Sequence, residues 1–197
     1  MALPRQFTVA ELIAMPASER GERYELIDGD LYMTPAPTDW HQAINGNLNF
    51  SLEAHVRAQR LGVVRFNSAV RVGEGTYVIP DAMFLTWARR QEAGDDVEEA
   101  IPDLACEILS PRTRHRDLLT KRRLYERIGV REYWIIDPDA QTVVVLGKGP
   151  QGFTELAEME PGVIPSRVLP ELRLTLAELF EDVVAYADRG TPGEGME

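Results

Sequence analysis

Two short apolar runs separated by one helical stretch constrain the fold of this chain most strongly. The runs are "DLACEIL" at 103–109 and "EYWIID" at 132–137, and both are bounded by turns that contain proline. Apolar segments of this length are typical of strands buried in a sheet. Residues 116–128 between them have helical character and are followed by Gly129, a residue that often ends a helix. We therefore expect buried strands with a helix packed against their sheet.

The other segments extend this pattern into a mixed α/β fold. "RYELIDGDLYMT" contains Asp-Gly between two strand-like halves, which is a strong hairpin signal. From Trp40 an apolar side chain recurs every fourth residue until about Gly62, which predicts a long helix. Residues 63–85 resemble strand with a turn at "GEG" (73–75), and 141–157 predict a further meander. This order predicts a central mixed sheet flanked by helices. Short helices are expected at the capping-box patterns Thr8–Glu11 and Thr175–Glu178.

Length and composition indicate one globular domain. The chain has 197 residues, enough for one well-packed core, and we expect a domain over 1–187 with a loose tail over 188–197. No apolar run approaches the roughly 20 residues of a membrane span, and the start of the chain lacks a signal-peptide pattern. A single cysteine, Cys106, is compatible with a reducing cytoplasm, and no cysteine–histidine spacing suggests zinc. We therefore predict a cytoplasmic protein with no membrane partner.

Charge is distributed unevenly along the chain. The formal net charge is −11, which argues against nonspecific coating of nucleic acid. Residues 112–131 nevertheless hold eight Arg or Lys against two acids, so this strip is +6 and the remainder is −17. A basic strip on an acidic body suits a confined anionic ligand, although a solvated helix face explains the same pattern.

Two carboxylates stand in apolar surroundings. Asp81 follows Pro80 within "YVIPDAMFL", and Glu107 interrupts "LACEIL". A buried carboxylate is costly unless it is paired or binds a cation, and Mg2+ is often held by one or two carboxylates. The alternatives are a turn at Asp81 and, for Glu107, an edge strand or an arginine partner.

The helix after Glu107 adds a second signal. Asp117, Lys121 and Tyr125 are spaced four apart and therefore share one helical face. A surface Asp–Lys pair is one interpretation. A lysine can also neutralise charge on an attacking water or a scissile phosphate. We expect Asp117 and Tyr125 to orient Lys121.

These segments resemble a known family. "YELIDG", "VIPDAMF" and "CEILSPRTRHRDLLTKRRLYERIGVREYWIIDP" are similar to the Uma2 restriction-endonuclease family of the PD-(D/E)xK nuclease superfamily, over about residues 8–180. The resemblance implies a core of a helix at 38–60, a three-stranded antiparallel meander, a helix and a last strand at 132–137. Asp81 would lie on the second core strand and Glu107 on the third.

The resemblance also implies roles for particular residues. Asp81 and Glu107 match the metal-ligand positions, with Mg2+ or Mn2+ as the cofactor. Leu109 occupies the usual lysine position, and Lys121 matches a lysine that has migrated to the following helix. Further expected members are Glu25 as an additional acid, His41 at the start of the long helix and Ser110 at the turn after Glu107, each with a structural alternative (a salt bridge, a packed or capping histidine, a turn-fixing serine). Phosphate contacts are expected from Arg112, Arg114 and Arg122.

The function expected from these residues is metal-dependent hydrolysis of DNA phosphodiester bonds. A homodimer is plausible because cutting two strands needs two sites. Two rivals remain open at this level: a nuclease fold that only binds nucleic acid or protein, and a hydrolase that uses paired acids on another substrate.

Overall fold

The computed structural model describes residues 5–16, 18, 21–181 and 183, so the predicted tail at 188–197 lies outside the described residues. A six-stranded sheet forms the centre of the molecule, in the order β10-β9-β8-β7-β6-β3. Strands β7 and β8 are parallel, and the other neighbours are antiparallel. The expected mixed α/β sheet is therefore confirmed. The strands are β3 (Gly62–Phe66), β6 (Ala82–Thr86), β7 (Leu104–Ile108), β8 (Glu132–Asp137), β9 (Thr142–Gly149) and β10 (Gly152–Glu155).

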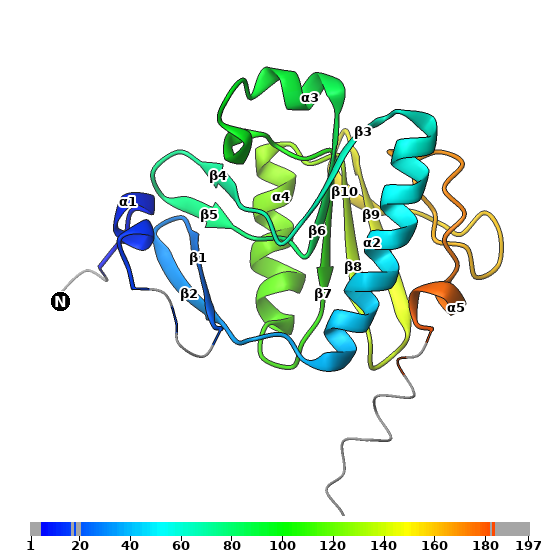
Figure 1. The fold of residues 1–197 in the computed structure, drawn as a ribbon, viewed down its shortest axis with the longest axis horizontal. Helices are drawn as coiled ribbons and strands as arrows, with labels where there is room; N and C mark the ends of the chain where they lie inside the picture. Colours follow the sequence, from blue (N-terminus) through cyan, green and yellow to red (C-terminus); the bar gives the residue numbers. More distant parts are fainter. Residues whose placement is uncertain (1–4, 17, 19–20, 182, 184–197) are drawn as a thin grey trace, which may run out of the picture.

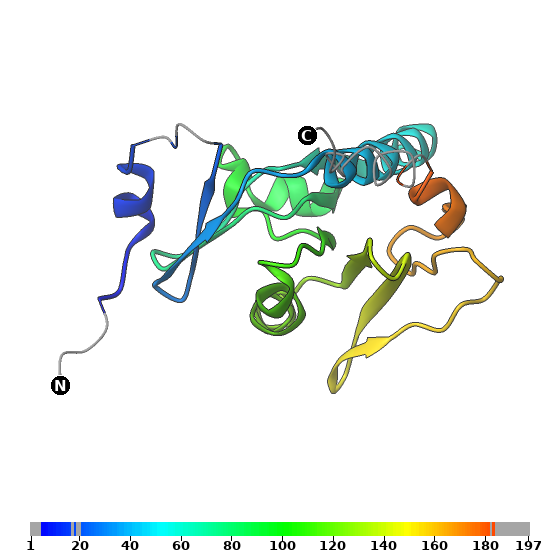
Figure 2. The ribbon, with the colours of Figure 1, turned by 90° about the horizontal axis from the view of Figure 1, so that it is seen from below.

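Helices cover both faces of this sheet. Helix α2 (Asp39–Gln59) buries its apolar stripe against one face, and the helix that links β7 to β8 covers the other (Figures 1 and 2). Alternation along β7 divides its side chains between the two layers: Leu104, Cys106 and Ile108 join the α2 side, and Ala105 joins the opposite side. Glu107 shares the face of Ala105 because side chains alternate along a strand. Two apolar layers thus enclose the middle of the sheet.

A second, four-stranded sheet stands beside the first, in the order β2-β1-β5-β4. Strands β1 (Arg23–Ile27) and β2 (Asp30–Thr34) form the expected hairpin. Asp28 and Gly29 both have positive φ, as a type I′ turn requires. The strands expected over 63–85 and the turn at 73–75 are present, but β4 (Val70–Val72) and β5 (Thr76–Val78) leave the central sheet and pair with the hairpin.

Short helices complete the described chain. The capping boxes at Thr8–Glu11 and Thr175–Glu178 are both present. Among the described residues, no helix is both long and apolar enough to span a membrane. The short elements are α1 (Val9–Ile13), α3 (Trp87–Glu92), the 3-10 turn η1 (Val97–Glu99) and α5 (Leu176–Leu179).

The helix expected over 116–128 differs from the prediction in its first half. Residues Arg116–Lys121 (η2) form a π-helix, and an α-helix, α4, follows over Arg122–Ile128. Gly129 ends α4 with φ 96°, in the left-handed region that glycine adopts at low cost. A π-helix has more residues in each turn than the 3.6 of an α-helix. Two residues four positions apart are therefore separated by closer to one complete turn. The π segment therefore keeps Asp117 and Lys121 on one face.

Buried Glu132 connects the sheet to the segment that follows β10. Its carboxylate accepts hydrogen bonds from Trp134 Nε1 at 2.8 Å and Ser166 Oγ at 2.7 Å. The backbone N–H groups of Arg167 and Val168 donate to its other oxygen at 2.8 and 3.2 Å. A buried carboxylate with four donors is well satisfied. These hydrogen bonds explain on structural grounds why a glutamate stands at the start of "EYWIID".

Two glycines provide a matched test of how closely β3 packs against β6. A Cβ at Gly62 would lie 1.9 Å from the carbonyl oxygen of Leu85, whereas a Cβ at Gly46 within α2 would meet nothing within 4 Å. We expect Gly62→Ala to lower the free energy of unfolding and Gly46→Ala to raise it by about 0.5–1 kcal/mol. Urea denaturation of both variants measures this. Equal effects of the two changes would contradict the β3–β6 packing described here.

Candidate active site

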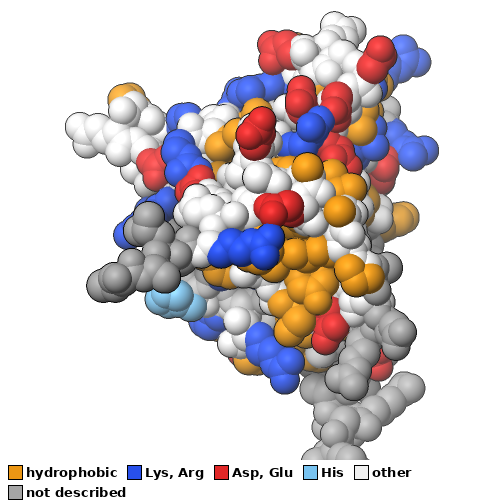
Figure 3. Space-filling model, turned by 90° about the vertical axis from the view of Figure 1, so that its left-hand side faces the viewer, with side chains coloured by type: hydrophobic (Ala, Val, Ile, Leu, Met, Phe, Trp, Pro, Cys, Tyr) orange, Lys and Arg blue, Asp and Glu red, His pale blue; other side chains and the backbone are white. Residues whose placement is uncertain are grey.

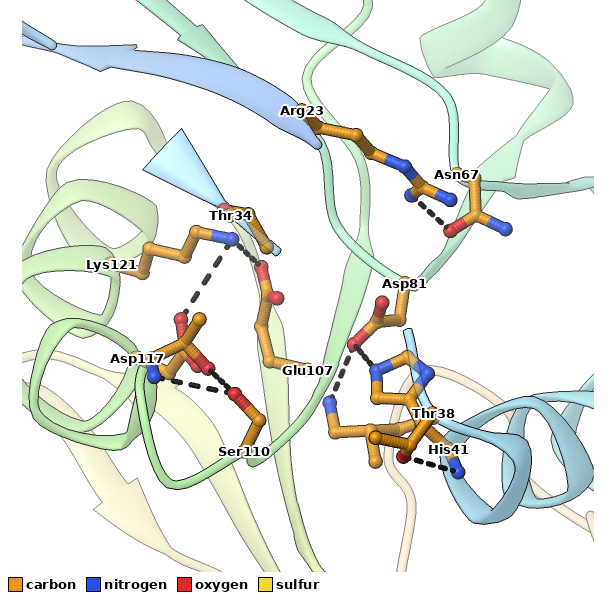
Figure 4. A network of polar contacts seen from close by, with 12 residues as sticks. Arg23, Thr34, Thr38, His41, Asn67, Asp81, Glu107, Ser110, Asp117 and Lys121 are labelled. Carbon is orange, nitrogen blue, oxygen red and sulfur yellow. Dashed lines mark hydrogen bonds and ion pairs between the residues drawn. The ribbon is translucent and has the colours of Figure 1, made fainter. Parts of the chain in front are cut away.

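Glu107 is at the centre of the site. It lies on β7, between β6 and β8, and its side chain is 5% exposed. Glu107 Oε1 accepts a hydrogen bond from Lys121 Nζ at 2.8 Å (Figure 4) and another from the Tyr125 hydroxyl at 2.7 Å. Both alternatives considered for this residue were wrong, since β7 is not an edge strand and the partner is a lysine rather than an arginine.

Lys121 is buried among three carboxylates. Its Nζ lies 2.8 Å from both Glu107 Oε1 and Glu25 Oε1, and 3.8 Å from Asp117 Oδ1. The side chains of Lys121 and Asp117 are each 2% exposed, so the interpretation as a surface pair was wrong. Burial by itself would lower the pKa of Lys121, but Glu107, Glu25 and Asp117 outweigh that effect and hold the pKa above its ordinary value. The lysine therefore remains a cation.

Glu25 reaches this cluster from the small sheet. It lies on β1, and its Oε1 accepts a hydrogen bond from the backbone N–H of Ile79 at 2.8 Å. Its Oε2 lies 3.1 Å from Arg116 and accepts a bond from the Thr34 hydroxyl at 3.2 Å. Burial raises the pKa of Glu25, but Lys121 and Arg116 more than offset this and leave it lowered. Glu25 is therefore an ionised member of the cluster, and its partners are buried cations rather than a strand-edge salt bridge.

Asp81 occupies a bend directly before β6, so its placement within a strand was wrong. Its Oδ2 accepts a hydrogen bond from the backbone N–H of Ile108 at 2.8 Å and lies 3.3 Å from His41 Nε2. Ala82 of β6 pairs with Cys106 of β7, which brings Asp81 and Glu107 to the same end of neighbouring strands. In Figure 4, Glu107 lies between Lys121 and Asp81. Thr38 is the N-cap of α2, so the interpretation of His41 as a capping residue was wrong; the His41 ring instead contacts Asp81.

The carboxylates of Asp81 and Glu107 line a recessed pocket of about 350 Å3. Asp81, Glu107, Asp117 and His41 contribute polar groups to its lining, and Arg112 and Arg116 contribute cations. Lys121 and Glu25 are not lining residues, because they pack behind Glu107 in the interior. The pocket thus has an acidic floor with a buried cation behind it.

The oxygen donors of this floor suit a hard divalent cation. Within the described residues, Asp81 Oδ1 and Glu107 Oε2 accept no hydrogen bond, so each carboxylate keeps one oxygen available. Burial raises the pKa of Glu107 well above its usual range; Lys121 lowers it, and the carboxylates of Asp117, Asp81 and Glu25 raise it further. A further cation beside Glu107 would favour its ionised form. In the described part of the chain, no group of three or more His, Cys, Asp or Glu side chains is placed to hold a metal ion, so a cation bound by Asp81 and Glu107 would need further oxygen ligands from water or substrate.

The three residues expected to support the site, Ser110, Asp117 and Tyr125, make different kinds of contact in the structure. Ser110 fixes the turn after β7: the backbone N–H of Thr113 donates to its Oγ at 3.3 Å, and its hydroxyl lies 2.9 Å from Thr113 Oγ1. Tyr125 donates to Glu107 Oε1, the same oxygen that accepts from Lys121, so its role in orienting Lys121 stays a prediction. Asp117 lies 3.8 Å from Lys121 and has one buried oxygen, Oδ1, without a hydrogen-bond partner among the described residues.

Of the three arginines expected to contact phosphate, one lines the pocket. Arg112 is exposed and lines the pocket. Arg114 instead pairs with Asp137 at 2.6 Å, and Arg122 is half-buried outside the pocket lining. Arg116, which the charge pattern did not single out, lines the pocket and contacts Glu25. The only sequence signal for Arg116 was its position in the basic strip.

The fold and this arrangement of acids and lysine define a nuclease-like α/β protein. A solved structure supports this class: a "putative nuclease belonging to DUF820 from Anabaena variabilis ATCC 29413" is 26% identical, with a TM-score of 0.74, over 90% of this chain and 99% of that chain. The family model Uma2, described as "Putative restriction endonuclease", matches residues 9–177. The chain therefore belongs to the Uma2 family. None of the curated proteins with which it was compared matches it.

Proposed function

We propose that this chain is a Mg2+- or Mn2+-dependent endonuclease that hydrolyses DNA phosphodiester bonds. The observation that carries the proposal is the meeting of Glu107 and Lys121 at 2.8 Å, on the strand next to Asp81 and at the floor of a pocket. Membership in a restriction-endonuclease family supports the reaction class.

Asp81 and Glu107 would hold the divalent cation through their available oxygens, with water and substrate phosphate completing its coordination. When bound, the cation would supply Lewis-acid polarisation of the scissile phosphate and activation of a water nucleophile. The Ile108 N–H and His41 fix the rotamer of Asp81, because both contact its Oδ2. Tyr125 and Lys121 fix Glu107 in the same way.

Lys121 supplies a permanent positive charge beside Glu107. A cation already held in place stabilises the negative charge of a phosphoryl transition state without reorganisation during the reaction. Glu25 and Asp117 keep Lys121 charged and limit its movement, since they are its other two partners. Arg112 and Arg116 would contact substrate phosphates at the pocket wall. For a duplex substrate the proposal includes a homodimer, because one site cuts one strand.

Isothermal titration with Mg2+ and with Mn2+ tests the metal site. We expect the wild type to give a binding isotherm and Asp81→Asn to give none, because the amide removes one of the two ionised ligands. Asn can still accept the Ile108 N–H bond, so the fold should be retained. Equal heats in the two proteins would overturn the metal site and favour a nuclease fold that only binds its partner.

A further inference from the structure

The walls of the candidate pocket differ in chemistry from its floor. The linker from β2 to α2 supplies Pro35, Ala36, Pro37 and the ring of Trp40, and Pro111 adds to these apolar walls. Trp40 is half-buried and packs partly against the core beneath α2. Metal ligation and phosphate binding do not require an apolar, aromatic wall. These walls instead suit an apolar or aromatic group of a ligand.

Three buried polar atoms of lining residues also lack hydrogen-bond partners. Among the described residues, Asp117 Oδ1, Arg116 Nε and His41 Nδ1 have no hydrogen-bond partner. Buried polar atoms are nearly always hydrogen-bonded, because an unpaired atom loses its hydrogen bonds to water and gains none in return. Arg116 Nε and Asp117 Oδ1 form an ion pair at 3.8 Å, and Asp117 Oδ1 lies equally far from Lys121 Nζ. Arg116 lines the pocket, and its guanidinium suits a phosphate group at the pocket wall.

The position of the floor limits what can reach it. The Asp81 and Glu107 side chains are 13% and 5% exposed, so a substrate phosphate must enter the pocket to approach them. A volume of about 350 Å3 lies at the lower end of small-molecule sites, which span roughly 300–1,000 Å3. It is large enough for one nucleotide and too small to enclose a base-paired, stacked duplex. On the side of the molecule in Figure 3, basic and acidic side chains are interspersed around an apolar area, unlike the basic stripe that follows a duplex backbone.

We propose that the pocket binds one unstacked nucleotide of single-stranded DNA, with its base against Trp40 and its phosphate between Arg116 and the acidic floor. This rests on the proposed nuclease function and adds its substrate class. Aromatic side chains are common platforms for unpaired bases, and enzymes that act deep in a pocket take their nucleotide out of the stack. A single-stranded substrate also needs only one active site.

Tryptophan fluorescence and binding test the proposal with the full chain. The probes are a single-stranded DNA oligonucleotide and the same sequence as a blunt duplex, in Ca2+, which takes the same oxygen ligands. We expect the single strand to quench fluorescence and to bind at least 10-fold more tightly than the duplex. Trp40→Ala should weaken single-strand binding by roughly 5- to 150-fold, since stacking is worth about 1–3 kcal/mol per base.

Trp87→Ala is the matched control, because Trp87 is 49% exposed and does not line the pocket. It should bind as the wild type does. Trp40→Phe keeps an aromatic platform, so it should lose the quench but retain more affinity than Trp40→Ala; circular dichroism checks each fold. Duplex binding as tight as single-strand binding, or an unchanged quench in Trp40→Phe, would overturn the inference. Metal-dependent plasmid cutting that survives in Trp40→Ala would then leave the proposed nuclease function standing.

Discussion

Replacing Lys121 with methionine is expected to lower the free energy of unfolding by about 3–5 kcal/mol, because the change leaves buried carboxylates without their cation. Methionine has a similar length and an apolar side chain, so the loss of charge dominates over the change in volume. Glu107 and Glu25 each lie 2.8 Å from Nζ, and neither has free access to solvent. Urea denaturation measures the effect.

Lys148 provides the control for this change. It is the only other lysine in the chain, and its Nζ donates to the carbonyl oxygen of Glu126 at an exposed position. Lys148→Met should shift the free energy of unfolding by no more than about 0.5 kcal/mol. In a Glu107→Gln background, Lys121→Met should cost less than in the wild type, since contacting residues are not additive. Equal costs for Lys121→Met and Lys148→Met would show that the buried cluster is not held by this lysine.

Loss of either proposed metal ligand is expected to reduce DNA cleavage by roughly 100-fold or more, because a bound cation is worth several kcal/mol of transition-state stabilisation. Asp81→Asn and Glu107→Gln each remove one ionised ligand and preserve size. Glu107→Gln retains an oxygen that can accept the Tyr125 hydroxyl, which limits the structural disturbance. Supercoiled plasmid and single-stranded circles, incubated with Mg2+, report both kinds of cutting.

Asp30→Asn and Glu158→Gln are the matched controls for these variants. Both residues are exposed, and neither lines the pocket. Their cleavage rates should equal that of the wild type. A normal rate for Asp81→Asn or Glu107→Gln would remove that residue from the catalytic site.

Local patterns in the sequence predicted the strands, the helices and the part of the site that lies between Glu107 and the helix after it. The spacing of Asp117, Lys121 and Tyr125 depends only on helical geometry, and the structure brings Lys121 and Tyr125 to Glu107. The burial of Glu107 followed from the apolar residues on either side of it. These are short-range relations, which a single sequence contains.

Long-range packing accounts for what the sequence did not predict. The contact of Glu25 with Lys121 depends on how the small sheet rests against η2, and hairpin patterns carry no such information. Arg116, the first residue of the π-helix, contacts Glu25, whereas the sequence showed only a run of arginines without distinguishing Arg116 from Arg114 or Arg122. The pocket wall from the β2–α2 linker, with Trp40, depends likewise on tertiary packing.

The central claim is that Asp81 and Glu107 form a divalent-cation site for phosphodiester hydrolysis, and the wild-type rate of DNA cutting in Mg2+ and in EDTA tests it most directly. We expect cutting in Mg2+, none after chelation, restoration by added Mg2+ or Mn2+, and no restoration in Asp81→Asn. Cutting that persists in EDTA, or equal cutting by wild type and Asp81→Asn, would contradict the account.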